Sequence, residues 1–443
     1  MNMKKKSGMK NSKLLIALLF CFGWIKTEAQ TVLTVEEAVK TALENNYDIR
    51  IASNELSIDK TNVTLGNAGA LPTVTANVVD NNGIQNSKQT RSDGTVNELD
   101  NAKNNSLNYG VGLNWTVFDG LRMFARYDQL KELQKLGEAE LRLAILTRIS
   151  DVISTYYIIA QQQQQLAALD TTIVISKQRL ELANNRYTIG KASKLEVLNA
   201  QVDLNTDTTN LLRQKELYAN TKIALNQLMA RDPQIDFFVI DDIQIDKTLQ
   251  LDELINLAQK QNPQLETQII NKRVAELQLK QVKAGRYPII GINTGYNFAR
   301  TESSLGFTIQ TQSRGLTYGF TATMNLFDGF NQHRNEKVAK LQIENSQILI
   351  EQQTENLKTQ LASAFQTYLT NMQLAELEQK NEEIAKQNLD ITMEKFRIGT
   401  IPTIEFRTAQ LNYVTAQTRS SDARFQAKLS EVALKELAGN LKF

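Results

Sequence analysis

The sequence predicts a mixed α+β membrane protein in which four transmembrane β-strands per chain join a barrel shared between copies, continued by long coiled-coil helices. Three observations predict this fold class. The chain contains an internal twofold repeat, and each repeat contains strands in which apolar and polar residues alternate. Only 5 of the 443 residues are proline, so the chain can form helices of unusual length.

The chain begins with the pattern of an export signal at residues 1–29. Five lysines precede an apolar run at residues 14–25, and Ala29 ends a plausible cleavage site. The run is too short to span a membrane. Its removal takes away six Lys and one Glu, which changes the formal net charge from +2 to about −3. Cys21 could also be a lipoprotein cysteine, although Phe20 stands where a small residue is expected.

The composition argues against several kinds of enzyme. A Ser-His-Asp or Cys-His site needs a histidine to move protons, and zinc sites are built mainly from His and Cys. The chain has one His, His333, which fits a solvated position, and its one Cys lies in the leader. It also lacks a phosphate-binding loop and a basic surface for nucleic acid. We therefore expect no catalytic residue, cofactor, metal site or nucleic-acid partner.

Segments of the first half recur in the second half in the same order. Gly120 and Gly190 are 70 residues apart, and so are Gly329 and Gly399, which follow them by 209 residues. The constant spacing indicates two copies of one structural unit. The recurring segments are Asn46 with Asn262, Val117 to Gly120 with Leu326 to Gly329, Arg186 to Gly190 with Lys395 to Gly399, and Ala200-Gln201 with Ala409-Gln410. The resulting division is a leader at 1–29, repeat 1 at 30–230, a mid-height connector at 231–248 and repeat 2 at 249–440.

Each repeat is expected to start with a helix and continue with a strand pair. The first helix should run from Thr34 to Ala70, about 55 Å, with an equivalent in repeat 2. Apolar and polar residues alternate from Leu107 to Val117 and again from Leu316 to Leu326, which is typical of strands with one face in lipid. Weaker strands are expected at 73–79 and 290–298, and exposed polar loops at 80–106 and 299–315. The two strand pairs therefore fall within 73–118 and 289–327.

A long helix and a shorter return helix complete each repeat. Apolar residues fall seven apart from Ile145 to Tyr187, a coiled-coil pattern that is less regular in repeat 2, where Glu382 interrupts it. Each long helix, about 100 Å in length, could then pack against two short helices, one along each half of its length. The expected elements are long helices at 121–187 and 330–396, tips at 188–193 and 397–403, and return helices at 194–230 and 404–438.

Four strands do not close a barrel, so the backbone N–H and C=O groups at the two sheet edges of one chain would lack hydrogen-bond partners in lipid. Two copies would give eight strands, and three would give twelve with a possible water-filled passage. The strand pattern alone leaves both open. A different class of protein, a secreted or surface coiled-coil scaffold without transport activity, would explain the heptads but would leave the strands without a partner.

The recurring segments resemble those of the TolC-type outer membrane efflux proteins, over essentially the whole mature chain. The resemblance implies a homotrimer with a twelve-stranded barrel in the outer membrane of a Gram-negative bacterium and a helical barrel in the periplasm. It also implies tips that engage a periplasmic adaptor (a membrane fusion protein) and an inner membrane pump, in an efflux or type I secretion system. Drugs, metals and proteins all remain possible substrates.

The resemblance also places the functional residues at the tips. The family's two entrance aspartates fall on Glu405 and Thr408, so one carboxylate is kept. Its entrance Tyr and Arg fall on Phe396 and Ile401, which have neither hydroxyl nor charge, and Tyr187 and Glu196 offer polar groups instead. The simpler interpretations are turn glycines at Gly190 and Gly399, N-caps at Ser193 and Thr403, and carboxylates favoured by a helix dipole. The entrance candidates are Glu405, Glu196, Tyr187, Phe396 and Thr408, and the adaptor-contact candidates are Gly190, Lys191, Ala192, Gly399, Thr400, Ile401 and Pro402.

Overall fold

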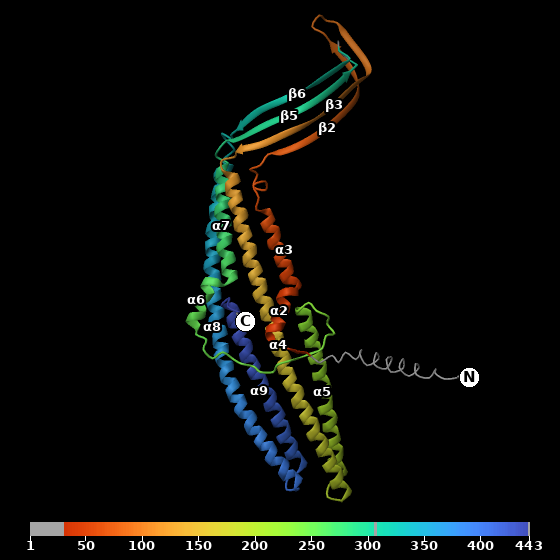
Figure 1. Cartoon of the computed structure of the whole chain (residues 1–443), viewed down its shortest axis with the longest axis vertical. Coiled ribbons are helices and arrows are strands. Elements are labelled where there is room, and N and C mark those ends of the chain that lie inside the picture. The colour runs from red at the N-terminus through yellow and green to blue at the C-terminus, as the bar shows by residue number, and fades with distance from the viewer. Residues whose placement is uncertain (1–30, 305–307, 442–443) are drawn as a thin grey trace, which may run out of the picture.

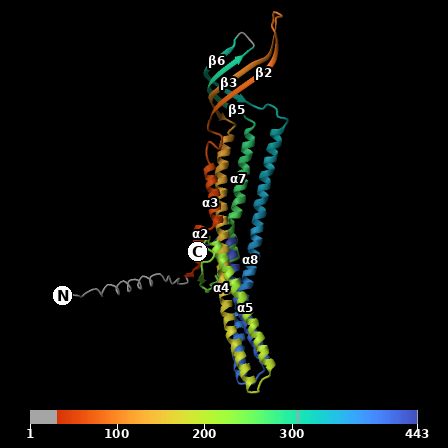
Figure 2. The same ribbon diagram turned by 90° about the vertical axis from the view of Figure 1, so that its right-hand side faces the viewer.

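The computed structural model describes residues 31–304 and 308–441. The expected leader, including Cys21, lies outside these residues. A sheet stands at one end of an elongated molecule, and long helices run from it to two helical tips at the other end (Figures 1 and 2). The molecule is therefore built from strands and helices that occupy separate ends, as the mixed fold class requires.

The sheet has four antiparallel strands in the order β2-β3-β5-β6. The expected loops at 80–106 and 299–315 are wrong, because these residues continue the strands as far as the pairs Thr90↔Val96 and Glu302↔Gln310. These strand segments show no alternation of apolar and polar residues, because most of their side chains are polar. They pair nevertheless, because strand pairing uses backbone groups that every residue other than proline carries. The last strand ends before Leu326. The strands are β2 (Thr73–Thr90), β3 (Val96–Phe118), β5 (Ile289–Ser303) and β6 (Gln310–Thr323).

A sharp corner joins the sheet to each of the two long helices, α4 (Arg122–Thr188) and α8 (Asn331–Arg397). The Asp119 carboxylate accepts a hydrogen bond from the Met123 backbone N–H at 3.0 Å, and Asp328 accepts one from Gln332 at 2.7 Å. Two successive residues after each aspartate have positive φ, including the non-glycine residues Leu121 and Phe330. Each aspartate thus caps a helix whose chain turns through a left-handed corner.

Substitution of Gly120 by Ala should destabilise the protein by about 1–3 kcal/mol more than the same change at Gly329. Both glycines have positive φ, 74° and 69°, so the backbone strain is similar. A Cβ at Gly120 would lie 2.5 Å from the Ala284 carbonyl oxygen, whereas a Cβ at Gly329 meets nothing closer than 3.8 Å. Thermal denaturation followed by circular dichroism compares the two variants. Equal losses would show that close packing at Gly120 is unimportant.

Each short upper segment is two helices, so the single helix expected from Thr34 to Ala70 is wrong. Asn46 breaks it, because its side-chain oxygen accepts hydrogen bonds from the backbone N–H groups of Asp48 and Ile49 and caps the second helix. Its side-chain amide also donates to the Leu228 carbonyl at 2.8 Å. Asn262 does the same in repeat 2, donating to the Leu437 carbonyl. The helices are α2 (Val35–Asn45), α3 (Tyr47–Asn62), α6 (Leu251–Gln261) and α7 (Pro263–Ala284).

The return helices complete a curved layer of helices. They are α5 (Lys194–Leu228) and α9 (Thr403–Leu437). In the lower half α5 packs on α4, α4 on α9 and α9 on α8, whereas in the upper half α3 packs on α4, α4 on α7 and α7 on α8. One margin of the molecule is therefore formed by β2, α3 and α5, and the opposite margin by β6 and α8.

The connector is fastened to the middle of α4. Its strand β4 (Phe237–Val239) pairs in parallel with β1 (Thr31–Leu33), two strands that sequence periodicity did not predict. The Tyr156 hydroxyl donates to the Leu33 carbonyl at 2.9 Å and accepts from the Ile240 N–H at 3.0 Å. The main apolar core surrounds this point. By length and composition α4 could also cross a membrane, but a buried core helix passes the same test.

A second contact ties the connector to α9. Glu431 is buried between Lys428 and Lys435, and one of its oxygens accepts from the Asp246 N–H at 3.0 Å. Hydrogen bonds from Thr248, with help from Lys435, lower the pKa of Asp246 to about 2. The connector is thus held at mid-height by both long hairpins.

Candidate functional site

Both tips have the same backbone geometry. At the end of α4 the Gly190 N–H donates to the Tyr187 carbonyl at 3.0 Å and the Lys191 N–H donates to the Arg186 carbonyl at 2.8 Å. Gly399 and Thr400 repeat this pattern at the end of α8. The two glycines have φ of 75° and 83°, and a Cβ on either would meet open space. They serve as the left-handed residues that end a helix, and their surroundings leave room for a partner.

The return helices begin differently at the two tips. Ser193 caps α5, because its hydroxyl accepts from the Glu196 N–H at 3.3 Å. The expected N-cap at Thr403 is wrong, since Pro402 occupies the cap position and Thr403 is the first helical residue. Proline leaves no side-chain acceptor there. The Thr403 hydroxyl is free to bond elsewhere, and it reaches the other tip.

Glu196 joins the two tips of the chain. Its Oε1 accepts a hydrogen bond from the Thr403 hydroxyl at 2.5 Å and lies 3.7 Å from Arg186 Nη1. The Arg186 guanidinium in turn lies 5.6 Å from the centre of the Phe396 ring, a cation–π contact between the hairpins. Of the residues predicted for the entrance, Glu196 and Phe396 are therefore both neighbours of Arg186.

Phe396 is a packing residue in this chain. It is 2% exposed and stacks on Phe406 with ring centres 5.0 Å apart, in a cluster with Leu389 and Ala409. Ile401 packs against the same cluster. Phe396, predicted as an entrance residue, therefore belongs to the packed interior between α8 and α9 in this chain.

The remaining predicted residues lie at the surface of the tips. Glu405 and Thr408 are exposed, and the Thr408 hydroxyl donates back to the Ile404 carbonyl at 2.9 Å. Tyr187 is 44% exposed, with the Lys194 ammonium 5.4 Å from its ring centre. Lys191, Thr400 and Pro402 are exposed as well, and Ala192 is half-buried. These side chains are available to solvent or to another protein.

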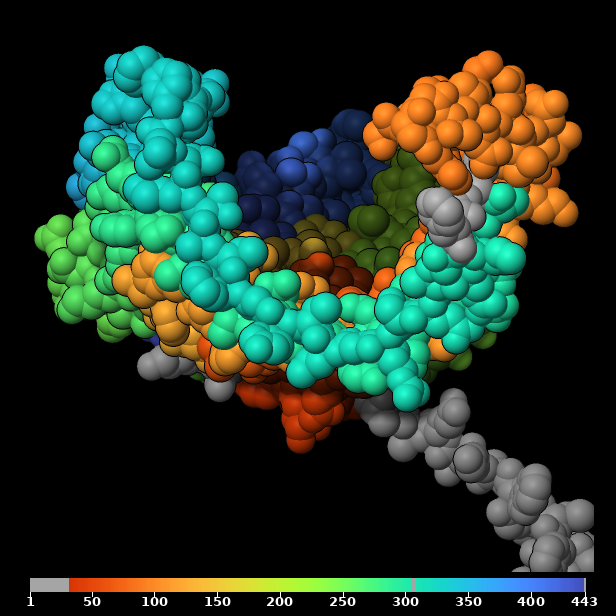
Figure 3. Space-filling model, turned by 90° about the horizontal axis from the view of Figure 1, so that it is seen from above, coloured from red at the N-terminus to blue at the C-terminus, as the bar shows by residue number. Residues whose placement is uncertain are grey.

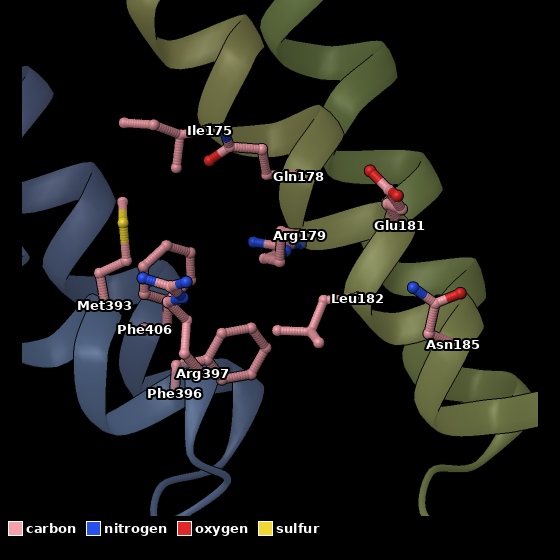
Figure 4. Close-up of a pocket in the computed structure, with 10 residues that line it drawn as sticks. All are labelled: Ile175, Gln178, Arg179, Glu181, Leu182, Asn185, Met393, Phe396, Arg397 and Phe406. Atoms are coloured by element: carbon pink, nitrogen blue, oxygen red, sulfur yellow. The ribbon is translucent and has the colours of Figure 1, made fainter. Parts of the chain in front are cut away.

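A cavity of about 520 Å³ lies between the two hairpins close to the tips (Figure 4). Leu182 and Arg179 of α4 face Phe396 and Arg397 of α8 across it. Arg179 is 2% exposed and donates to Asp203 through Nη2, whereas its Nε and Nη1 atoms have no hydrogen-bond partner within the described part of the chain. The hairpins are thus in contact around the cavity but do not fill it.

A buried polar network crosses from α9 to α4 and α5 above the tips, and sequence reasoning missed it. Arg407 and Asp207 form two parallel hydrogen bonds of 2.9 Å. Ser176 donates to Asp207 at 2.6 Å, and Gln410 donates to Ser176 at 3.0 Å. The only signal in the sequence was a charged residue beside apolar positions of each return helix, which does not identify its partner.

Comparisons with known proteins agree on one family. A family model described as outer membrane efflux protein matches residues 38–231 and 254–440. Outer membrane protein TolC of Escherichia coli (strain K12) is 18% identical over 273 residues, 60% of this chain and 55% of that protein. The chain therefore matches little more than half the length of this relative.

Two solved structures extend the likeness to the fold. The outer-membrane channel OprN has a TM-score of 0.75 at 17% identity, covering 92% of this chain and 90% of that one. The Campylobacter jejuni CmeC outer membrane channel has a TM-score of 0.75 at 16% identity, covering 99% and 93%.

Proposed function

The chain belongs to the outer membrane efflux protein family, and from this premise we propose that it forms the exit duct of an export system. The resemblance found in the sequence is confirmed, and the chain is a protein of the Gram-negative outer membrane. The duct would pass small molecules or polypeptides outward in a tripartite efflux or type I secretion system. The alternative of a secreted coiled-coil scaffold does not fit this family.

The main support for this proposal is that the sheet has an unpaired strand edge at each margin of the molecule. Within residues 31–304 and 308–441, β2 and β6 each pair on one side only, and the strands seen from above form an open arc (Figure 3). Unpaired edges cannot face lipid. Three copies would close twelve strands around a passage, as the resemblance implies. The accessible surface, 28757 Å² against about 17,000 Å² for a compact monomer of this mass, also supports assembly.

Apolar stripes on the margin helices support the same assembly. On α8, large exposed apolar residues fall seven apart, which is the spacing of a coiled-coil seam. The opposite margin has matching pairs on α3 and α5. We propose that α8 of one copy packs against α3 and α5 of the next. The stripes are Leu341 with Ile348, and Leu377, Ile384 with Ile391, on α8, followed by Ile398 just beyond its end; Ile51 with Ile58 on α3; and Leu195 with Val202 on α5.

The proposed mechanism involves no bond making. Substrates would move through water, and the pump would supply the free energy. Glu405, exposed just beyond the second tip, would place one carboxylate per chain at the periplasmic entrance. The exposed tip residues would contact the adaptor, with the twofold repeat presenting two similar tips per chain. The internal repeat, the trimer and the adaptor contact are parts of this one proposal.

Replacement of Glu405 by Gln should weaken the block of ion current by hexaamminecobalt(III). A ring of carboxylates concentrates a trivalent cation at the entrance, and removal of the charges should raise the blocking concentration at least tenfold. The measurement is single-channel conductance of the purified protein in planar bilayers, with the cation added from the side of the helical tips. Glu98→Gln, in the hairpin at the opposite end, is the matched control. Absence of any channel would contradict the duct itself, and unchanged block would remove Glu405 from the entrance.

Replacement of Thr400 by Asp should abolish export while outer membrane levels stay normal. Thr400 is exposed at the second tip, so the change removes only the hydrogen bond from its hydroxyl to the Lys395 carbonyl, at 2.9 Å, and places a charge on the proposed adaptor contact. A deletion strain complemented with each variant is tested for susceptibility to toxic compounds, with protein levels measured by immunoblot. Thr359→Asp, exposed far up α8, is the control. Normal export by the Thr400 variant would contradict adaptor contact at this tip.

A further inference from the structure

We propose that the cavity between the two hairpins binds a small amphiphilic anion, a molecule with one oxyanion group and an apolar body. The observation behind this is a buried arginine, Arg179, whose guanidinium points from α4 into the cavity with part of its hydrogen-bonding capacity unused (Figure 4). All the walls come from α4, α8 and α9 of one chain. The site therefore goes beyond the proposed exit duct and does not depend on how copies of the chain assemble.

Arg179 lies on the face of α4 that turns toward the other hairpin. Ile175, Arg179 and Leu182 follow one another at intervals of four and three residues, so their side chains lie on one side of the helix. The buried Arg179 side chain donates to Asp203 through Nη2, and no described residue accepts a hydrogen bond from Nε or Nη1. A buried donor without an acceptor is unfavourable, so a ligand that supplied oxygen atoms to these nitrogens would bind to a group already held in place.

The charges around the cavity favour an anion over a neutral acceptor. Asp203 balances the charge of Arg179 but meets only one of its three nitrogens. Across the cavity, Arg397 of α8 pairs with Glu394 at 3.1 Å, and both side chains are about two-thirds exposed, so this pair is weak and leaves Arg397 able to turn to a ligand. Glu181 is the acidic residue among those that line the cavity, and it lies farther from α8 than Arg179 does (Figure 4). The two guanidinium groups on opposite walls therefore set the charge of the ligand.

The apolar part of the lining sets the other half of the ligand's chemistry. Ile175 and Leu182 of α4 face Met393 and Phe396 of α8 and Phe406 of α9. The volume, about 520 Å³, is in the range of small-molecule sites, and such sites combine an apolar lining with a few polar groups. Inorganic phosphate would meet the arginines but leave the apolar lining uncovered. We therefore expect an aromatic or short aliphatic carboxylate or sulfonate, bound between helices of both hairpins.

Isothermal titration calorimetry tests the site with two probes that differ in charge, naphthylacetate and its neutral amide, naphthylacetamide. The purified protein is titrated in an uncharged detergent near pH 7, where the carboxylate is ionised, and titrations into detergent alone correct for uptake by micelles. The unaltered protein should bind the carboxylate at least tenfold more tightly than the amide, because only the carboxylate forms charge-assisted hydrogen bonds with Arg179. Inorganic phosphate, the third probe, should bind at least tenfold more weakly than naphthylacetate.

The variants test which groups give this preference for the anion. Arg179→Met keeps a side chain of similar length but removes the guanidinium, and it should make the two affinities equal within about twofold. Arg397→Gln should reduce the preference by about threefold, because this side chain is more exposed. Arg213→Gln, an exposed arginine on α5 away from the cavity, is the matched control and should leave both affinities unchanged.

Three results would overturn the proposal. The first is an unaltered protein that binds neither probe or does not prefer the carboxylate. The second is an Arg179→Met variant that weakens both probes equally, because a merely structural role of the arginine would do that. The third comes from Leu182→Trp, which keeps the guanidinium but fills the cavity, and which serves as the test if Arg179→Met does not fold: unchanged binding by this variant would place the probe elsewhere. Conductance of the same preparations in planar bilayers tests the exit duct separately.

Discussion

Replacement of Arg407 by Leu is expected to lower the free energy of unfolding by about 3–5 kcal/mol. The guanidinium makes two hydrogen bonds to Asp207, which is buried between three helices. Its loss would leave a carboxylate in a site with little water, and only Ser176 would remain as a donor to it. The double variant Arg407→Leu with Asp207→Leu should recover much of the loss, because no unpaired charge is then buried.

Arg419→Leu on the same helix is the matched control. Arg419 pairs with Glu378 at 3.2 Å, but its side chain is 55% exposed, so this pair should contribute about 0–1 kcal/mol. Unfolding in denaturant, followed by circular dichroism at fixed protein concentration, compares the variants. Similar losses for the two arginines, or a double variant as unstable as Arg407→Leu alone, would show that burial of the charges does not decide the stability of this contact.

The double substitution Ile384→Glu with Ile391→Glu is expected to abolish assembly of the chain into its oligomer. Both side chains are exposed, 65% and 60%, on the margin of α8, where we propose that the next copy packs. Six acidic groups per trimer would then face an apolar seam, and burying an unpaired carboxylate is unfavourable. The chain itself should still form helix, because neither side chain belongs to an internal cluster.

Size-exclusion chromatography with light scattering in detergent measures this effect, and circular dichroism checks helix content. Lys386→Glu, an exposed position on the same helix between the two, controls for added negative charge. A stable oligomer with both glutamates in place would place the seam elsewhere on the molecule. Dissociation caused by Lys386→Glu would show that the effect is not specific to the stripe.

Local sequence signals were sufficient for the long helices and for the turns between them. The scarcity of proline and the heptad spacing predict helices of the length that α4 and α8 have, 67 residues each. Gly190 and Gly399 mark the tips, because a left-handed residue that ends a helix is most often glycine. Asn46 carried a signal that was overlooked, since an asparagine within a helical pattern can cap a second helix. The polar halves of the strands have no alternation of apolar and polar residues, so the sequence predicts loops there.

The sequence by itself determined the periodic elements and the family, because period, turn chemistry and order of segments are properties of neighbouring residues. Only the tertiary structure decided which side chains meet. Glu196 and Thr403, or Arg407 and Asp207, are about 200 residues apart, and no local pattern relates them. Their meeting depends on how α9 packs against α4 and α5. The buried ionic contact between Arg407 and Asp207 is therefore visible only in the folded chain.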